Sequence, residues 1–413
     1  MKKLLYNPAQ ILTINTKGKN LKRGEEQSDV GLKENSSIVV EDGLIRDFIN
    51  TTEIEKSSFP DIIDLTGKTV LPGLVECHTH TIFAGSRADE FRMKLDGTDY
   101  EEIAKKGGGI LSTVKSVRES SFDDLVEIAK PRIDYFIAQG ITTLEIKSGY
   151  GLSFYDEIKI LQVIQHLNNH YPIDIVATFL GAHTYPPEYK KDRKKYLEII
   201  TDEMIPYIAE NNLAEFCDAF CESTAFSAEE VDQIFQSAKK HKLKLKLHTE
   251  QFNNVGGLEI AIKNKATSVD HLEVLNDEQI DLFKKSKTIA VLLPGVSFFL
   301  DYDYAPARKL IDNKIPIALA TDYNPGSSHI ANLNFIMSLA SLKMKLSIEE
   351  VITSVTINAA AALSRNKSIG SLEINKQADF AIFDTDNYAD IVYQVGKNIC
   401  GMTIKDGQLI YKA

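Results

Sequence analysis

Cysteine is scarce in this chain, and the spacing of the few that occur fits neither a zinc knuckle nor a disulfide scaffold. The sequence therefore predicts a reducing, cytoplasmic location. The first twenty residues lack the apolar core and cleavage site of a signal peptide, and no apolar run approaches the ~20 residues of a membrane helix. We expect no membrane segment. The cysteines are Cys77, Cys217, Cys221 and Cys400.

An excess of basic residues is also missing. Lys and Arg number 47 against 58 Asp and Glu, a net charge of −11, which argues against a nucleic-acid partner and against a polybasic membrane patch. Hydrophobic residues make up 43% and charged residues 25%, so the composition is globular and not disordered. At ~150 residues per domain, the 413 residues predict two to three domains, or one large barrel with an appendage.

The middle of the chain alternates short apolar runs with longer helical patterns, such as 122–140 and 227–241. This alternation predicts βα units around a parallel sheet, and eight such units predict a (β/α)8 TIM barrel of the α/β class over residues 67–362. The eight predicted strands are 73–80, 142–149, 175–183, 216–222, 243–250, 266–273, 288–294 and 315–322.

Both ends of the chain have a different pattern. Residues 1–66 and 363–413 contain short strand-like runs separated by turn signals, including an Asp-Gly pair at 406–407. We expect these two β-rich ends to form one small sheet domain together if the termini meet in space.

Histidines collect where the predicted barrel strands end. In barrel enzymes the active site lies at the face formed by the C-terminal ends of the strands. Asp322 also lies at that face, because it ends the eighth predicted strand. His78 and His80 are two residues apart, so on a strand both rings point to the same side and can hold one metal ion. A lone His-x-His pair has the alternative of a hydrogen-bonded structural pair, but the further strand-end ligands favour a metal site. The five strand-end histidines are His78, His80, His183, His248 and His271.

The blocks around these residues resemble the amidohydrolase superfamily, and within it the imidazolonepropionase family. VLPGLVECHTH (70–80) and ALATD (318–322) carry the resemblance to the superfamily, as do the C-terminal segments 356–363 and 369–384. The resemblance implies a metal-dependent barrel with a small β-sandwich built from both termini. The blocks that resemble the family are 83–114, EIKSGYGL (145–152), LGAHTYPPEY (180–189), KLHTEQ (246–251) and ATDYNPGSS (320–328).

This resemblance implies a function in histidine degradation. The expected reaction is hydrolysis of the cyclic amide of 4-imidazolone-5-propanoate to N-formimidoyl-L-glutamate, with a metal-activated water as nucleophile. One divalent ion, Zn²⁺ or Fe²⁺, is expected on His78, His80, His248 and Asp322. Two-metal relatives carry a bridging group, often a modified lysine, at the end of the fourth strand. Glu222 stands there instead, so we expect one metal and a supporting role for Glu222. A homodimer is a further expectation from the family.

Catalytic and substrate-binding residues follow from the same resemblance. Asp322 is expected to transfer protons and His271 to polarise the carbonyl or shuttle a proton. Arg87 is expected to grip the propanoate, its alternative being a surface ion pair with Asp89 or Glu90. The predicted substrate contacts are Arg87, Tyr150, His183, Gln251, Asn324, Gly326 and Ser327.

Two other functions compete with this interpretation. The chain could be another amidohydrolase, either one that acts on a ring amine or a different cyclic amidase, and the metal ligands alone do not separate these. Four features favour a carboxylate-bearing imidazolone: Arg87, Tyr150, GGGILSTV (107–114) and YNPGSS (323–328). The second alternative is a metal-free binding protein, against which all four ligand positions are filled.

Overall fold

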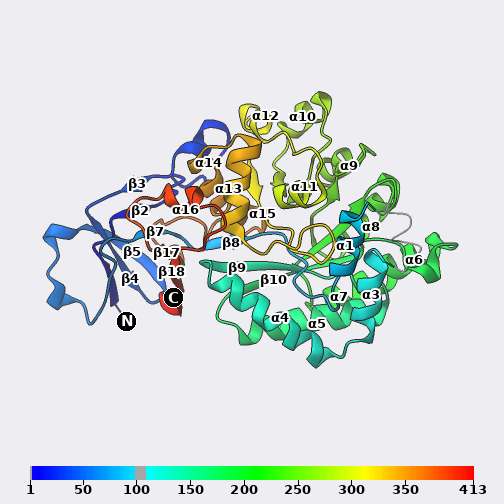
Figure 1. The fold of residues 1–413 in the computed structure, drawn as a ribbon, viewed down its shortest axis with the longest axis horizontal. Coiled ribbons are helices and arrows are strands. Elements are labelled where there is room, and N and C mark those ends of the chain that lie inside the picture. Colours follow the sequence, from blue (N-terminus) through cyan, green and yellow to red (C-terminus); the bar gives the residue numbers. More distant parts are fainter. Residues whose placement is uncertain (1, 98–107) are drawn as a thin grey trace.

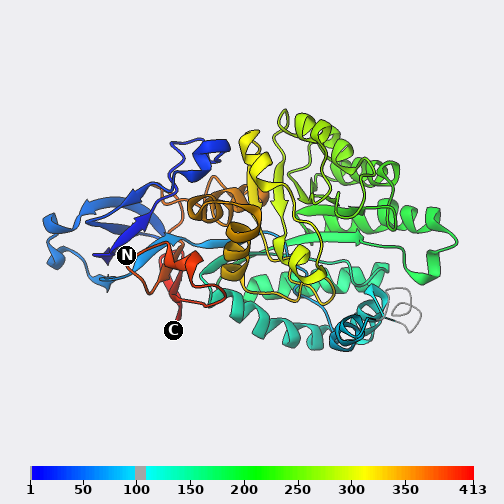
Figure 2. The same ribbon diagram turned by 45° about the horizontal axis from the view of Figure 1, so that its top comes forward.

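The computed structural model describes residues 2–97 and 108–413. Figure 1 shows the two ends of the chain together at one end of the molecule, with the barrel and its helices at the other. The turned view in Figure 2 keeps the same separation, so the two ends do form one β domain beside a (β/α)8 barrel, as predicted.

The barrel sheet follows the chain order, because each strand pairs in parallel with the next one. A parallel bridge between Thr79 and Tyr323 brings the two edges together, and the Asp322 amide donates to the His78 carbonyl at 3.1 Å. The fifth predicted strand is split into β12 (Lys244–Leu245) and β13. The eight barrel strands are β8 (Leu74–Glu76), β9 (Ile141–Lys147), β10 (Asp174–Ala182), β11 (Phe216–Cys221), β13 (His248–Thr249), β14 (Ser268–His271), β15 (Ile289–Leu292) and β16 (Ile317–Leu319).

Helices cover the outside of the barrel (Figure 1). The predicted helical stretches 122–140 and 227–241 are confirmed as α4 and α8. Both begin with a capping box, in which Ser121 or Ser227 and the acid three residues on satisfy each other's backbone amides. The helices are α1 (Ala88–Leu95), α3 (Ile110–Glu119), α4 (Phe122–Ile137), α5 (Phe154–His170), α6 (Arg193–Glu198), the π-helix η5 (Ile199–Met204), α7 (Ile205–Glu210), α8 (Ala228–Lys240), α9 (Gly257–Asn264), α10 (Asp277–Phe283), α11 (Pro294–Leu300), α12 (Ala307–Asp312), α13 (Leu333–Met344), α14 (Ile348–Ser354), α15 (Ile357–Ala362) and α16 (Asp390–Tyr393). In the described ranges no helix combines the length and apolar character needed to cross a membrane.

The small domain is a sandwich of two sheets. One sheet contains only N-terminal strands, whereas the other joins strands from both ends of the chain. Leu5 and Ile38 of the first sheet share an apolar core with Phe380 and Ile404 of the second. The sheet orders are β5-β4-β1-β6 and β19-β18-β17-β7-β2-β3, with β1 (Lys2–Tyr6), β2 (Gln10–Leu12), β3 (Leu32–Lys33), β4 (Ser36–Glu41), β5 (Leu44–Asn50), β6 (Asp61–Asp64), β7 (Thr69–Pro72), β17 (Phe380–Phe383), β18 (Cys400–Lys405) and β19 (Gln408–Lys412).

Strand β7 connects the small domain to β8, the first strand of the barrel. It pairs with β17, so it belongs to the sandwich although it lies within the predicted barrel range 67–362. The division into 1–66 with 363–413 and 67–362 stays a proposal, with β7 on the sandwich side. Gly73 follows it where no side chain fits, because a Cβ there would lie 2.2 Å from Thr142 Oγ1. This close approach seats β8, and with it His78 and His80.

Candidate active site

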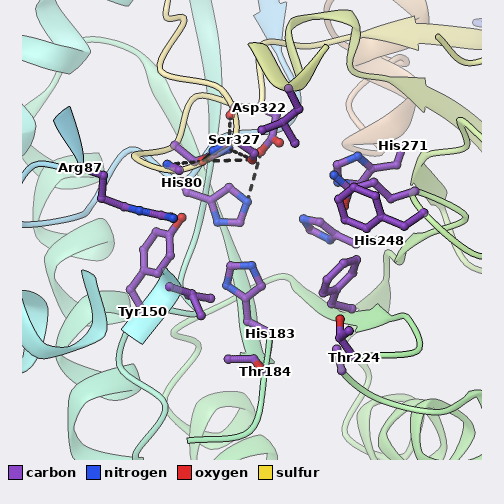
Figure 3. A pocket seen from close by; sticks show the side chains of 18 residues that line it. His80, Arg87, Tyr150, His183, Thr184, Thr224, His248, His271, Asp322 and Ser327 are labelled. Carbon is purple, nitrogen blue, oxygen red and sulfur yellow. Dashed lines mark hydrogen bonds and ion pairs between the residues drawn. The ribbon is translucent and has the colours of Figure 1, made fainter. Parts of the chain in front are cut away.

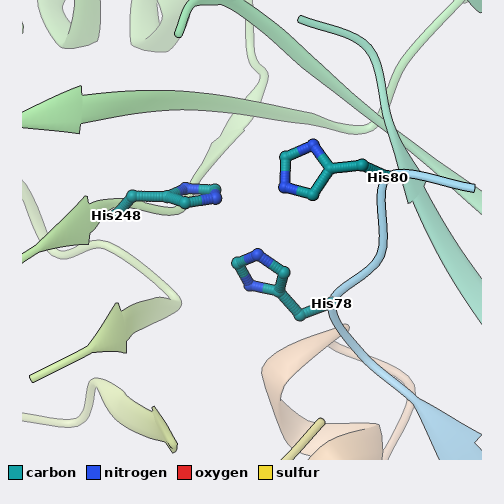
Figure 4. Close-up of side chains that lie close together, drawn as sticks. All are labelled: His78, His80 and His248. Carbon is teal, nitrogen blue, oxygen red and sulfur yellow. The ribbon is translucent and has the colours of Figure 1, made fainter. Parts of the chain in front are cut away.

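Three histidines converge at the mouth of the barrel (Figure 4). His78 and His80 come from the segment after β8 and His248 begins β13, and one ring nitrogen from each lies within 4.8 Å of the others. Asp322 follows β16, with its Oδ1 3.3 Å from His78 Nε2 and 3.4 Å from His80 Nε2. All four side chains are buried. The strand-end residues that the sequence predicts as ligands therefore meet in one place.

The protonation of His78 tests whether this cluster fits a cation. His78 Nδ1 lies 2.7 Å from Asp270 Oδ2, so the ring hydrogen is on Nδ1 and Nε2 presents a lone pair to the Asp322 carboxylate. Within the described residues neither Nε2 nor Asp322 Oδ1 has a hydrogen-bond donor. Two acceptors held 3.3 Å apart repel each other, and a cation between them removes the repulsion.

His248 also lies beside a buried carboxylate. Its Nδ1 is 3.0 Å from Asp218 Oδ2, at ion-pair distance, and neither ring nitrogen makes a hydrogen bond among the described residues. Burial lowers the pKa of both His78 and His248 well below the usual value, which keeps the rings neutral and able to bind a metal. Three imidazoles and one carboxylate are the donor set of zinc or iron(II) sites, so the residues present fit a divalent ion.

A cavity of about 360 Å³ opens above this cluster (Figure 3). His80, His248, His271 and Asp322 lie on its wall, whereas His78 lies below. The cavity also brings together all the predicted substrate contacts: Arg87, Tyr150, His183, Gln251, Asn324, Gly326 and Ser327.

Arg87 reaches the cavity while paired with Glu90. Its Nε and Nη2 each lie 2.9 Å from Glu90 Oε2, and that carboxylate also accepts from the Gly109 amide at 3.0 Å and the Ser112 hydroxyl at 2.9 Å. The Nη1 end lies against Gly326, where an added Cβ would be only 2.0 Å away. The ion pair considered as an alternative therefore exists, and Arg87 lines the cavity all the same, with Nη1 beside Gly326.

The loop after β9 carries Tyr150 and is held from below by Glu157. Its carboxylate accepts from the amides of Gly149, Gly151 and Leu152 at 2.7–3.2 Å. His183 Nδ1 lies 3.0 Å from the Gly149 carbonyl, and its ring stacks on His80 with centroids 5.2 Å apart. Burial raises the pKa of Tyr150, so the phenol stays a hydrogen-bond donor. In Figure 3 Tyr150 and Arg87 lie side by side on one wall, opposite His271.

His271 stands at the end of β14 with a left-handed backbone φ of 87°. Its Nδ1 is 3.6 Å from Glu273 Oε1, whereas the neighbouring Asp270 turns to His78. Burial alone would lower the pKa of His271, but the carboxylates of Glu273, Asp322 and Asp270 together outweigh it and the pKa is raised. The ring is therefore a good donor toward a developing negative charge.

Two polar side chains on loops at the mouth, Asn324 and Gln251, already make hydrogen bonds within the protein. Asn324 Oδ1 accepts from the Gly326 and Ser327 amides at 2.8 Å each, and its Nδ2 donates to the Asp322 carbonyl at 2.7 Å. Its side chain thus shapes the loop more than it faces a ligand. Gln251 Nε2 donates to the Tyr302 hydroxyl at 3.1 Å.

Glu222 and Glu250 lie beside the site and support loops. Glu222 Oε2 accepts from the Phe252 and Asn253 amides at 3.1 Å each, which fixes the segment after Gln251. Glu250 is buried and accepts from the Leu258 amide at 3.3 Å. Neither carboxylate belongs to the cavity wall.

Sequence reasoning missed several charged residues that hold the site. These residues do not resemble ligands, but a charged side chain on a wholly buried strand is itself a signal, because burying an unpaired charge is costly. β9 contains two such residues, Glu145 and Lys147, although every residue of the strand is buried. The missed residues are Glu145, Lys147, Glu157 and Asp218, together with the pairing of Asp270 with His78.

Comparison with known proteins assigns the chain to a family. Residues 69–410 match the model of the amidohydrolase family. The chain is 43% identical to an imidazolonepropionase of Shouchella clausii, over 99% of this chain and 93% of that one. It is 45% identical to an imidazolonepropionase of Geobacillus thermodenitrificans, over 94% and 92%. An adenosine deaminase from Xanthomonas campestris with bound zinc shares the fold, with a TM-score of 0.74 at 14% identity over 98% of this chain and 92% of that chain. The chain therefore belongs to the imidazolonepropionase family of the amidohydrolases.

Proposed function

We propose that His78, His80, His248 and Asp322 hold one divalent ion, Zn²⁺ or Fe²⁺, and that Asp322 and His271 carry out the proton transfer and charge stabilisation of the family's reaction. As a member of this family the protein hydrolyses the cyclic amide of 4-imidazolone-5-propanoate to N-formimidoyl-L-glutamate. The observation that carries the metal proposal is the buried lone-pair contact between His78 Nε2 and Asp322 Oδ1 at 3.3 Å. When bound, such an ion lowers the pKa of a coordinated water to ~7 and polarises the substrate carbonyl.

Asp322 is proposed to move the proton of the reaction. It accepts a proton from the attacking water as the new O–C bond forms at the ring carbonyl. It then returns that proton to the ring nitrogen as the C–N bond breaks, so the leaving group departs neutral. Its burial and its position between the histidines and the cavity support this role. His271 donates to the carbonyl oxygen while that oxygen gains negative charge.

Arg87 is the proposed partner of the propanoate. Its Nη1 lies beside Gly326 on the cavity wall, and a guanidinium binds a carboxylate through two parallel hydrogen bonds. Tyr150 and His183 line the adjacent wall and are proposed to orient the ring, together with Gln251 and Ser327. An aminohydrolase acting on a neutral ring has no use for a cation at this place, so Arg87 favours the carboxylate-bearing substrate.

The test is hydrolysis of freshly made 4-imidazolone-5-propanoate by metal-replete and chelator-treated protein. We expect the ring's ultraviolet absorbance to fall and N-formimidoyl-L-glutamate to form with the replete sample only, and activity to return on adding Zn²⁺ or Fe²⁺ without air. Turnover that survives complete metal removal would refute the metal proposal. The homodimer and the cytoplasmic location stay predictions, which sedimentation and localisation of the tagged protein can test.

A further inference from the structure

A compact charge cluster lies directly beneath the proposed metal site. Lys147 Nζ lies 2.7 Å from Glu145 Oε1, 2.9 Å from Asp218 Oδ2 and 3.7 Å from Asp270 Oδ2. Lys246 Nζ lies 3.3 Å from the same Glu145 oxygen and donates to the Cys77 carbonyl at 2.9 Å. All five charged side chains are fully buried, and none of them lines the cavity.

Two of these carboxylate oxygens connect Lys147 to the metal-facing histidines. Asp270 Oδ2, 3.7 Å from Lys147, is the atom that His78 Nδ1 approaches to 2.7 Å. Asp218 Oδ2, 2.9 Å from Lys147, is also the atom 3.0 Å from His248 Nδ1. Each oxygen therefore lies within ion-pair distance of the ammonium group and of one imidazole. The contact is a hydrogen bond for His78 and a close approach of opposite charge and ring nitrogen for His248.

The two aspartates would not keep these positions without a cation. Asp218 and Asp270 offer oxygens that lie, with a His248 nitrogen, within 4.8 Å of one another, close enough for a second metal ion to bind. Buried carboxylates at such a separation repel strongly in a medium of low dielectric constant. Lys147 Nζ, 2.9 Å and 3.7 Å from these two oxygens, supplies a positive charge beside them.

We propose that Lys147 is a positioning residue that fixes the rings of His78 and His248 through Asp270 and Asp218, and that its ammonium group takes the place of a second metal ion. This inference rests on the proposed metal site. Residues that orient metal-binding histidines from behind set the affinity of the ion, and their loss weakens binding by ~10–100-fold. Lys147 acts indirectly, because it contacts the carboxylates of Asp218 and Asp270 and not the histidine rings.

The decisive variant is Lys147→Met, which keeps the length of the side chain and removes its charge. The matched control is Lys405→Met in the sandwich, since Lys405 is also buried and lies 3.0 Å from both Asp379 and Asp174. We would measure the zinc dissociation constant by chelator competition, the visible spectrum of the cobalt(II) form, and the fold by circular dichroism. We expect zinc to bind ~10–100-fold more weakly to the Lys147 variant, with an altered cobalt spectrum. The Lys405 variant should lose thermal stability only.

A second variant guards against a failure to fold. Lys147→Met with Glu145→Gln removes one positive and one negative charge, so the total charge of the cluster is unchanged. We expect it to fold and still bind zinc weakly. A zinc affinity and a cobalt spectrum equal to those of the wild type, in either folded variant, would overturn the proposal. Loss of the fold in both variants would also overturn it, because Lys147 would then serve folding alone. A wild-type protein that binds no stoichiometric metal would instead refute the proposed function.

Discussion

Replacing Gly326 by alanine should impair substrate binding without harming the fold. The added Cβ would lie 2.0 Å from Arg87 Nη1 and 2.9 Å from Arg87 Cζ, whereas carbon and nitrogen atoms in van der Waals contact are ~3.5 Å apart. The guanidinium must therefore withdraw by about 1.5 Å. Gly326 has no left-handed backbone angle, and Arg87 can move at its flexible end. The free energy of unfolding should thus change by less than ~0.5 kcal/mol.

The size of the kinetic effect follows from the contact that is lost. A hydrogen bond to a charged group contributes ~1.5–3 kcal/mol, and each 1.4 kcal/mol is a factor of ten, so kcat/KM should fall by ~10–150-fold. The propanoate lies away from the bond that breaks. Loss of the Arg87 contact with the propanoate therefore weakens binding in the ground state and the transition state alike, and KM should rise more than kcat falls.

The assay is the initial rate of absorbance loss from 4-imidazolone-5-propanoate at several concentrations, for the wild type, Gly326→Ala, Arg87→Met and the double variant. If Gly326 acts by making room for Arg87, alanine should add no further loss once Arg87 is gone. Normal KM for Gly326→Ala beside an impaired Arg87→Met would refute the reasoning. A full additional loss in the double variant would also refute it.

Three further predictions concern other parts of the molecule. Asp322→Asn should lower kcat by ~10²–10⁴-fold, and full turnover with metal retained, by elemental analysis, would contradict its role in proton transfer. Burial raises the pKa of Asp379 to about 6, so from pH ~4 to 6 the folded protein holds a proton that the unfolded chain releases. The free energy of unfolding in urea should therefore fall as pH rises through this range, and Asp379→Asn should flatten the curve; an unchanged slope would count against this. The four cysteines are buried, and burial raises the pKa of their thiols: Cys77, Cys217, Cys221 and Cys400. Ellman's reagent should therefore label them only after denaturation. Rapid labelling of the native protein would contradict their burial.

Much of the fold could be predicted from the sequence because its signals are local. The alternation of apolar runs with helical patterns is written within each βα unit, and Ser121 and Ser227 begin helices through contacts with residues three positions away. The candidate site could be predicted from the sequence for a related reason. Parallel strands in a barrel end at one face, so residues at strand ends must meet whatever the detailed packing. His78, His248 and Asp322 could be grouped on that ground alone, and the family resemblance added Arg87.

What only the tertiary structure decided are pairings between side chains that are distant in sequence. Asp270 is adjacent to His271 in the chain, yet it contacts His78, 192 positions away, because strand register and barrel closure set that distance. The contacts of Lys147 with Asp218 and of Arg87 with Gly326 are of the same kind. β7 likewise pairs with β17, more than 300 residues later, and joins the sandwich. The sequence by itself determined which elements form and which residues reach the mouth of the barrel. The three-dimensional packing decided the partner of each buried charge, because that choice depends on distances between strands and not on the order of residues.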